Sequence, residues 1–177
     1  MIYESRVLAA EGYLDLGMAR DAWSELNLIE DDDQFHVDVI KMRIDILMYQ
    51  HKWKDAYRLA SQLCKILPSF SEFYIDTAEC LFRMREKQRA VHFLEKAPAN
   101  VRLLPEYFYN LACYETSMGQ FTEAEANLLK SFKMNRAFKN RALSDPDLKR
   151  LRKSVKPLKI HKILKASSKT HRLPVFN

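Results

Sequence analysis

Apolar side chains recur along most of this chain at intervals of three and four residues, the spacing that places them on one face of an α-helix. Only three glycines are present, too few for the tight turns of a β-sandwich or barrel. The pattern predicts eight helices in four consecutive pairs, expected near residues 2–16, 19–30, 34–50, 53–66, 70–84, 87–97, 105–118 and 121–134.

Small residues repeat along the chain with a fixed period of 34 positions. One column holds Ala22, Ala56, Ala90 and Ala124. Small residues are needed where two antiparallel helices cross closely, and the larger side chains around them fill the remaining gaps. A chain that repeats at this period stacks one helix pair on the next, since each pair leaves an apolar face for its neighbour to cover. Equivalent positions before and after the column hold Ala10, Ile44, Ala78 and Ala112, and Leu26, Ala60, Leu94 and Leu128.

Prolines mark the expected ends of the later helices. Pro98 should stop the sixth helix and Pro105 should open the seventh, with a longer connector between them. Asp145 and Pro146 are typical of a cap and first residue, and they predict a short ninth helix through about Ser154. Its apolar residues, Leu148 and Leu151, are expected to cover the last repeat.

These repeats resemble the tetratricopeptide repeat family, whose pattern is Trp-x2-Leu-Gly-x2-Tyr followed by Ala, an aromatic residue or leucine, Ala and Pro. Residues from about 2 to 136 follow it. The fourth copy matches best, and the residues that carry the resemblance there are Phe108, Leu111, Ala112, Gly119, Phe121, Ala124 and Leu128. The other copies contribute Tyr13, Gly17 and Ala22, then Leu47, Trp53, Ala56 and Pro68, then Tyr74, Ala78, Ala90, Leu94 and Ala97.

The resemblance implies an all-α fold, a right-handed α-solenoid of antiparallel helix pairs with four repeats and a C-terminal capping helix. Residues 142–148 are similar to the ending of small bacterial tetratricopeptide proteins with no assigned activity. Arg43 and Thr77 depart from the pattern, since the family usually has leucine there. These departures concern local packing.

The resemblance also implies a binding surface, because the first helix of each pair lines the concave face in this family. The equivalent positions hold nine carboxylates and two bases, with Met, Phe and Tyr among them. The candidate partner-binding residues are Glu11, Asp15, Asp38, Lys41, Met42, Asp45, Tyr49, Glu72, Asp76, Glu79, Phe82, Tyr109 and Asn110.

This acidic surface favours a basic peptide with apolar anchors, because a concave cleft of one charge attracts the opposite charge. Family members that bind the carboxylate ending of heat-shock chaperones use Lys, Asn and Arg instead. Only Lys41 and Asn110 fit that set, so such a ligand is disfavoured. The alternative is an ordinary polar helix surface that binds no ligand.

Charge divides the chain into an acidic body and a basic tail, although the net charge is +6. Residues 1–135 hold 16 Lys and Arg against 21 Asp and Glu, whereas residues 136–177 hold 13 against 2. We therefore expect a repeat domain over residues 1–154 and a basic tail over residues 155–177.

Several roles fit the tail, in which bases alternate with apolar residues. It fits a solvated chain end, a nucleic-acid-binding segment, or a short amphipathic helix on anionic lipid. The version we prefer is a tail that docks in an acidic groove, its own or a neighbour's. Nucleic-acid association through the tail is the alternative function.

No catalytic or metal-binding signature is present in the sequence, so we expect a protein- or peptide-binding scaffold that is not an enzyme and uses no cofactor. Asp31, Asp32 and Asp33 fit a solvated, cap-forming turn better than an acid/base site. The cysteines Cys64, Cys80 and Cys113 fit buried, reduced thiols. No apolar run is long enough for a membrane span and no signal peptide is evident, which favours the cytoplasm. The pattern specifies no oligomeric state.

Overall fold

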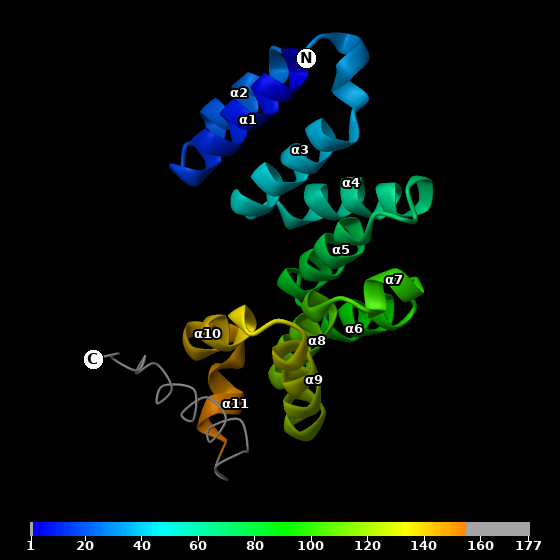
Figure 1. The fold of residues 1–177 in the computed structure, drawn as a ribbon, viewed down its shortest axis with the longest axis vertical. Helices are drawn as coiled ribbons and strands as arrows, with labels where there is room; N and C mark the ends of the chain where they lie inside the picture. Colours follow the sequence, from blue (N-terminus) through cyan, green and yellow to red (C-terminus); the bar gives the residue numbers. More distant parts are fainter. Residues whose placement is uncertain (1, 155–177) are drawn as a thin grey trace, which may run out of the picture. The chain divides into compact units, whose positions relative to one another are not determined.

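The computed structural model describes residues 2–154, with the side chains from residue 3 onward, and within this range the regular structure is entirely helical (Figure 1). The basic tail of residues 155–177 lies outside the described residues. The chain divides into two compact units between Arg89 and Ala90, inside helix α6 (Lys87–Glu95). Each unit is described by itself below.

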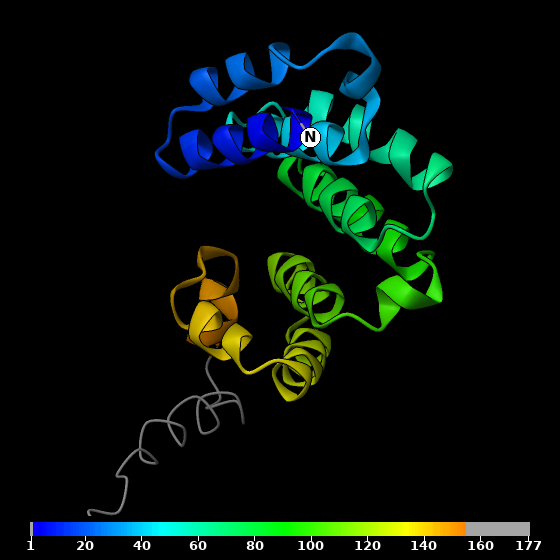
Figure 2. The ribbon, with the colours of Figure 1, turned by 45° about the horizontal axis from the view of Figure 1, so that its top comes forward.

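The first unit begins with two helix pairs. Helices α1 (Ile2–Asp15) and α2 (Ala19–Asn27) form one pair, and α3 (Val37–Tyr49) and α4 (Trp53–Ile66) form the next. Both α1 and α2 pack against α3, so the second pair covers the first. Helix α5 (Ser71–Arg83) then packs along α4, as Figure 2 also shows. A short 3-10 helix, η1 (Asp31–Phe35), connects the two pairs.

The second unit contains the best match to the repeat pattern. Helices α8 (Pro105–Met118) and α9 (Phe121–Met134) pack closely side by side (Figure 2). Gly119 ends α8 in the left-handed region, with φ of 85°, where glycine is the residue under least strain. A short helix α7 (Ala99–Arg102) precedes this pair, and α10 (Ala137–Ser144), η2 (Pro146–Leu148) and α11 (Lys149–Lys153) follow it.

The small residues of the 34-residue column lie in the core, as expected. The exposed fraction is 0% for Ala22, Ala56, Ala90 and Ala124. The equivalent residue twelve positions earlier in each copy is also fully buried, and so is the one four positions later, apart from Leu128 at 1%. Burial at all these positions confirms that the period marks the helix seams and shows the expected all-α repeat of helix pairs.

The C-terminal cap packs against the last repeat as predicted, but it is not a single helix. Leu148 and Leu151 are buried at 1% and 2% exposure, and η2 and α11 contact α8. The Asp145 side chain accepts a hydrogen bond from the Asp147 backbone N–H at 2.9 Å, which is the expected N-terminal cap. A 3-10 turn followed by a short α-helix replaces the single helix that the sequence predicts.

Three further elements differ from the sequence prediction. Helix α10 was not expected at all, and α7 occupies the connector between Pro98 and Pro105. Helix α2 ends at Asn27, three residues earlier than predicted, because Gln34 supplies hydrogen bonds after it. Its Nε2 donates to the carbonyl oxygens of Leu26 at 3.1 Å and Ile29 at 2.6 Å. These bonds satisfy carbonyl groups that a longer helix would have paired internally.

Candidate partner-binding surface

The candidate residues of the first unit come from the first helix of each pair, α1, α3 and α5. Helix α1 lies against α3, and Lys41 of α3 reaches Asp76 of α5 with a distance of 3.5 Å from Nζ to Oδ2. The three helices are thus neighbours in this unit. The expected surface is defined here by Glu11 and Asp15 on α1, Asp38, Lys41, Asp45 and Tyr49 on α3, and Glu72, Asp76 and Glu79 on α5.

At the centre of this surface, one lysine faces several carboxylates. Lys41 donates a short hydrogen bond to Asp45, one turn later in α3, and forms the ion pair with Asp76. Burial alone would lower the pKa of Lys41, but Asp76, Asp45 and Glu72 together raise it above its usual value. Lys41 is therefore fully charged at neutral pH. One positive charge against three carboxylates leaves this cluster, hereafter the Lys41 cluster, with an excess of negative charge.

Asp76 is the most enclosed carboxylate of the Lys41 cluster. Its side chain is 14% exposed, and its Oδ2 is buried with no hydrogen-bond partner among the described residues. Burial raises the pKa of Asp76 to about 6, against the opposing effect of Lys41. Lys41 does not offset this burial because its charge is shared with Asp45. A further positive charge nearby would therefore stabilise the ionised form of Asp76.

The acids around the Lys41 cluster face solvent. Glu11 and Asp15 are exposed, the side chain of Asp38 is 61% exposed, and Glu72 within the cluster is exposed as well. Glu79 is the exception, because it accepts a hydrogen bond from Arg83 Nε at 2.7 Å. Tyr49, at the end of α3, is 51% exposed and is the accessible aromatic residue among the candidates in this unit.

Three candidate residues have buried side chains that pack within the core. Met42 belongs to the core formed by α1, α2 and α3, and Phe82 is only 8% exposed. Tyr109, in the second unit, is fully buried and lies 4.9 Å from Phe138, measured between ring centroids. A partner cannot contact Tyr109 on the surface, so its inclusion was wrong. Helix α10, which the sequence pattern did not predict, supplies Phe138 and helps to enclose the Tyr109 ring. Asn110 is half-buried in α8.

The three cysteines are free and buried, as predicted. Burial raises the pKa of Cys64 to about 11 and that of Cys80 to about 12. Cys64 Sγ lies 3.6 Å from the Thr77 hydroxyl, which explains why threonine is accommodated where the family has leucine. Arg43, the other departure from the pattern, lies over the Trp23 ring at 5.6 Å and bonds Gln34.

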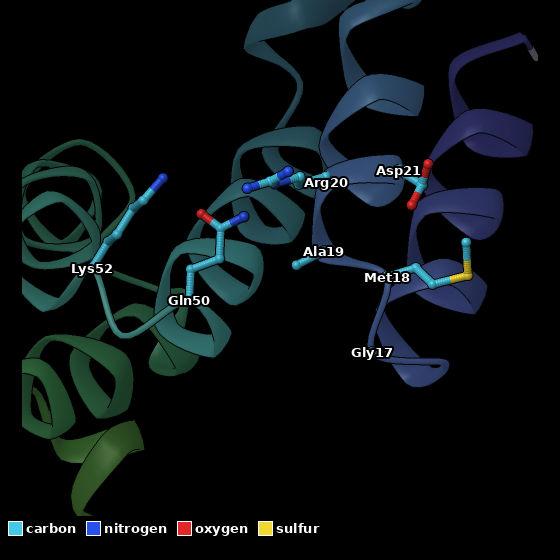
Figure 3. Close-up of a pocket in the computed structure, with 7 residues that line it drawn as sticks. All are labelled: Gly17, Met18, Ala19, Arg20, Asp21, Gln50 and Lys52. Atoms are coloured by element: carbon cyan, nitrogen blue, oxygen red, sulfur yellow. The ribbon is translucent and has the colours of Figure 1, made fainter.

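Sequence analysis missed a second feature of the first unit, an open pocket of about 580 Å³ at the turns between paired helices (Figure 3). Figure 3 shows the Arg20 side chain extending from α2 toward Gln50, with Lys52 beyond Gln50 in this view. These residues do not occupy the first-helix positions that line the concave face in the tetratricopeptide repeat family. The resemblance to that family therefore did not indicate them. The lining residues are Gly17, Met18, Ala19, Arg20, Asp21, Gln50 and Lys52.

Comparison with known proteins supports the fold. No protein-family model matches the chain, and no curated protein matches it in sequence. A solved structure titled "MamA RS-1 ArsTM double mutant" is similar, with a TM-score of 0.64 over 94% of this chain and 96% of that chain, at 12% identity. At this identity the similarity concerns the fold alone. The chain has a tetratricopeptide-like helical repeat fold.

No group of three His, Cys, Asp or Glu side chains suited to a metal ion occurs within residues 3–154. None of the helices in the described part of the chain is both long and apolar enough to cross a membrane.

Proposed function

We propose that this protein is a binding scaffold that holds a basic peptide segment of a partner protein on the acidic surface of α1, α3 and α5. The Lys41 cluster is the observation that carries the proposal. It places Asp45, Glu72 and Asp76 around a single internal base, and Asp76 Oδ2 has no hydrogen-bond partner among the described residues. An arginine or lysine side chain of a partner would neutralise the excess charge.

The surroundings of the cluster favour a peptide with apolar residues beside its basic ones. Tyr49 offers an exposed aromatic ring on α3, and Leu8 on α1 is 68% exposed. A few residues, most often aromatic side chains and arginine, contribute most of the binding energy in protein interfaces, whereas exposed charges mainly set the rate and the choice of partner. The exposed acids Glu11, Asp15 and Asp38 would extend the attraction beyond the cluster.

The experiment that tests this proposal is a peptide titration followed by fluorescence anisotropy. The probe is a labelled twelve-residue peptide that alternates Lys or Arg with Leu, and its match replaces each base by Gln. The full chain should bind the basic peptide in a saturable manner and bind the Gln peptide much more weakly. Equal binding of the two peptides, or no saturable binding of either, would refute the proposal.

A matched pair of variants then locates the binding site. The double variant Asp45→Asn, Glu72→Gln removes two charges from the Lys41 cluster and should weaken basic-peptide binding by roughly tenfold, as expected for lost charged contacts. The control Asp55→Asn, Glu30→Gln makes the same chemical changes at two exposed residues outside the surface. Equal loss in both variants would mean that net charge alone governs binding.

The second candidate function, nucleic-acid association, depends on the tail of residues 155–177. Docking in the acidic groove depends on the same tail, which lies outside the described residues. The same titration distinguishes them from the proposal. Deleting residues 155–177 should leave peptide binding intact or strengthen it, whereas binding of a nucleic acid through the tail would be lost.

A further inference from the structure

The pocket of Figure 3 lies at two consecutive turns of the first unit. It is bounded by the turn from α1 into α2 and by the turn from α3 into α4. A second, smaller cavity of about 240 Å³ shares Arg20, Gln50 and Lys52 with it and adds Trp23 and Leu47 to the lining. Cavities of this size are typical of sites for small ligands or single side chains of a partner.

Among the residues that the structure describes, the side chains of the two cations of this pocket have no ionic partners. Arg6, Arg58 and Arg89 in the same unit each pair with a carboxylate. By contrast, the side chains of Arg20 and Lys52 form no ion pair and no hydrogen bond with any described residue, and Arg20 accepts a side-chain hydrogen bond only at its backbone carbonyl oxygen, from Ser24 Oγ. The pocket thus carries a net positive charge on a body whose net charge is negative. The amide of Gln50 adds a neutral donor between the two cations.

The apolar lining of the smaller cavity, Trp23 and Leu47, is fixed in place by the core. Leu47 is 7% exposed, and Trp23 packs against the core of α1, α2 and α3. The Arg43 guanidinium covers the Trp23 ring at 5.6 Å and is itself held by Gln34. Trp23 therefore presents a preorganised apolar surface beside the two free cations, and little side-chain freedom is lost when a ligand contacts it.

The charge of the lining selects the charge of the ligand. Arg20 and Lys52 contribute two positive charges and Asp21 contributes one negative charge, which leaves a net charge of +1. A single carboxylate matches this charge, whereas a dianionic phosphate would leave an excess of negative charge beside Asp21. We propose that this pocket and the smaller cavity that shares Arg20, Gln50 and Lys52 with it together bind an amphipathic monoanion, one carboxylate joined to an apolar group, with the carboxylate at Arg20 and Lys52 and the apolar group against Trp23.

The test uses the full chain labelled with ¹⁵N and three small probes that share one phenylpropyl group: 4-phenylbutyrate, its neutral amide, and 4-phenylbutylamine, its cationic analogue. In NMR titrations, 4-phenylbutyrate should shift the Gly17 amide and the Trp23 indole signals in a saturable manner. The amide and the amine should bind at least roughly tenfold more weakly, because each lacks the charge that the two cations attract. Equal shifts from all three probes would overturn the proposal.

Variants and a second ligand complete the test. The double variant Arg20→Gln, Lys52→Gln should weaken binding of 4-phenylbutyrate by roughly tenfold or more. Lys54→Gln, which removes an exposed lysine of α4 outside the pocket, should leave binding unchanged. Loss of binding in Lys54→Gln, or competition by inorganic phosphate at equal concentration, would contradict the assignment of a monoanion.

A capped peptide containing Glu followed by Leu distinguishes the source of the carboxylate. If the peptide shifts the same signals and binds more tightly than 4-phenylbutyrate, the natural ligand is a segment of a partner protein. Weaker peptide binding assigns the pocket to a small organic acid. Failure of the basic-peptide titration above would not affect either result, because the Lys41 cluster and this pocket share no residue.

Discussion

The hydroxyl of Tyr109 donates a hydrogen bond of 2.7 Å to Oδ2 of Asp145, and the two residues lie 36 positions apart in the sequence. The other oxygen of Asp145, Oδ1, accepts the Asp147 backbone N–H, and the Arg141 guanidinium lies over the Tyr109 ring at 4.8 Å. One carboxylate therefore begins η2 and ties it to α8. Tyr109 is a structural residue of the second unit.

Tyr109→Phe removes this hydrogen bond and leaves Oδ2 of Asp145 without the hydroxyl donor, while Oδ1 keeps the Asp147 N–H. We expect the free energy of unfolding to fall by about 1.5–3 kcal/mol, the usual range for a bond to a charged group. Urea denaturation followed by circular dichroism measures the change. Tyr57→Phe is the control, because its hydroxyl faces only Arg89 at 3.5 Å near the surface, and it should change stability little. Equal effects of the two variants would contradict the assignment.

Ala124 tests the helix seam between α8 and α9. Ala124→Leu inserts a large side chain where the exposed fraction is 0%, so we expect the free energy of unfolding to fall by about 1–3 kcal/mol. Ala126→Leu, two positions later on the exposed side of α9, makes the same chemical change without crowding. Urea denaturation compares the two variants. A tolerated leucine at position 124 would mean that small residues are not required at this crossing.

Asp76 should make stability depend on pH. Its pKa is raised from 3.8 to about 6 in the folded chain, so the folded state binds more protons than the unfolded state between these values. The stability that protonated Asp76 contributes is present below about pH 4 and is lost as the pH rises through 6. Asp76→Asn should remove this dependence, so its stability relative to the parent chain should rise from pH 4 to pH 7.

Thermal unfolding at several pH values, compared between Asp76→Asn and the parent chain, measures that difference. Ala126→Leu, which changes no titratable group, is the control. The difference for Ala126→Leu should stay constant over the same range. A constant difference for Asp76→Asn as well would mean that the buried carboxylate does not titrate in this window.

The buried thiols should react slowly while the chain is folded. With a pKa of about 11, roughly 0.1% of Cys64 is thiolate at pH 8, and Cys80 has still less. Labelling with a disulfide reagent should therefore proceed much more slowly in buffer than in urea, where the thiols are exposed. Labelling of any one of the three cysteines at the rate of an unfolded thiol would contradict its burial.

Periodicity predicted the helix pairs well because the signal lies in residues that must be small or apolar for packing. Ala22, Ala56, Ala90 and Ala124 are all buried, although they lie in helices of different length and composition. Helix α10 was missed for the opposite reason. It buries only Phe138 and Ala142, and its remaining residues are mostly polar or basic, so they could not be separated from the basic tail that follows.

The candidate surface was harder to predict than the fold. The first-helix positions predicted acids on α1, α3 and α5, but position alone does not say whether a side chain faces solvent or the core. Met42 and Phe82 show this, since both are buried at positions of the binding surface. No sequence pattern indicated the pocket with Arg20 and Lys52. Its residues lie in or beside two turns that come together only after two helix pairs have stacked.

The fixed 34-residue spacing of the buried alanines also limits which insertions and deletions the gene can tolerate. Each residue turns an α-helix by about 100°, so one extra codon between Ala56 and Ala60 in α4 would rotate Ala60 and the buried residues after it out of their positions in the core. Small insertions and deletions should therefore survive only at the turns, while growth or shortening of the array should proceed by whole units of 34 codons.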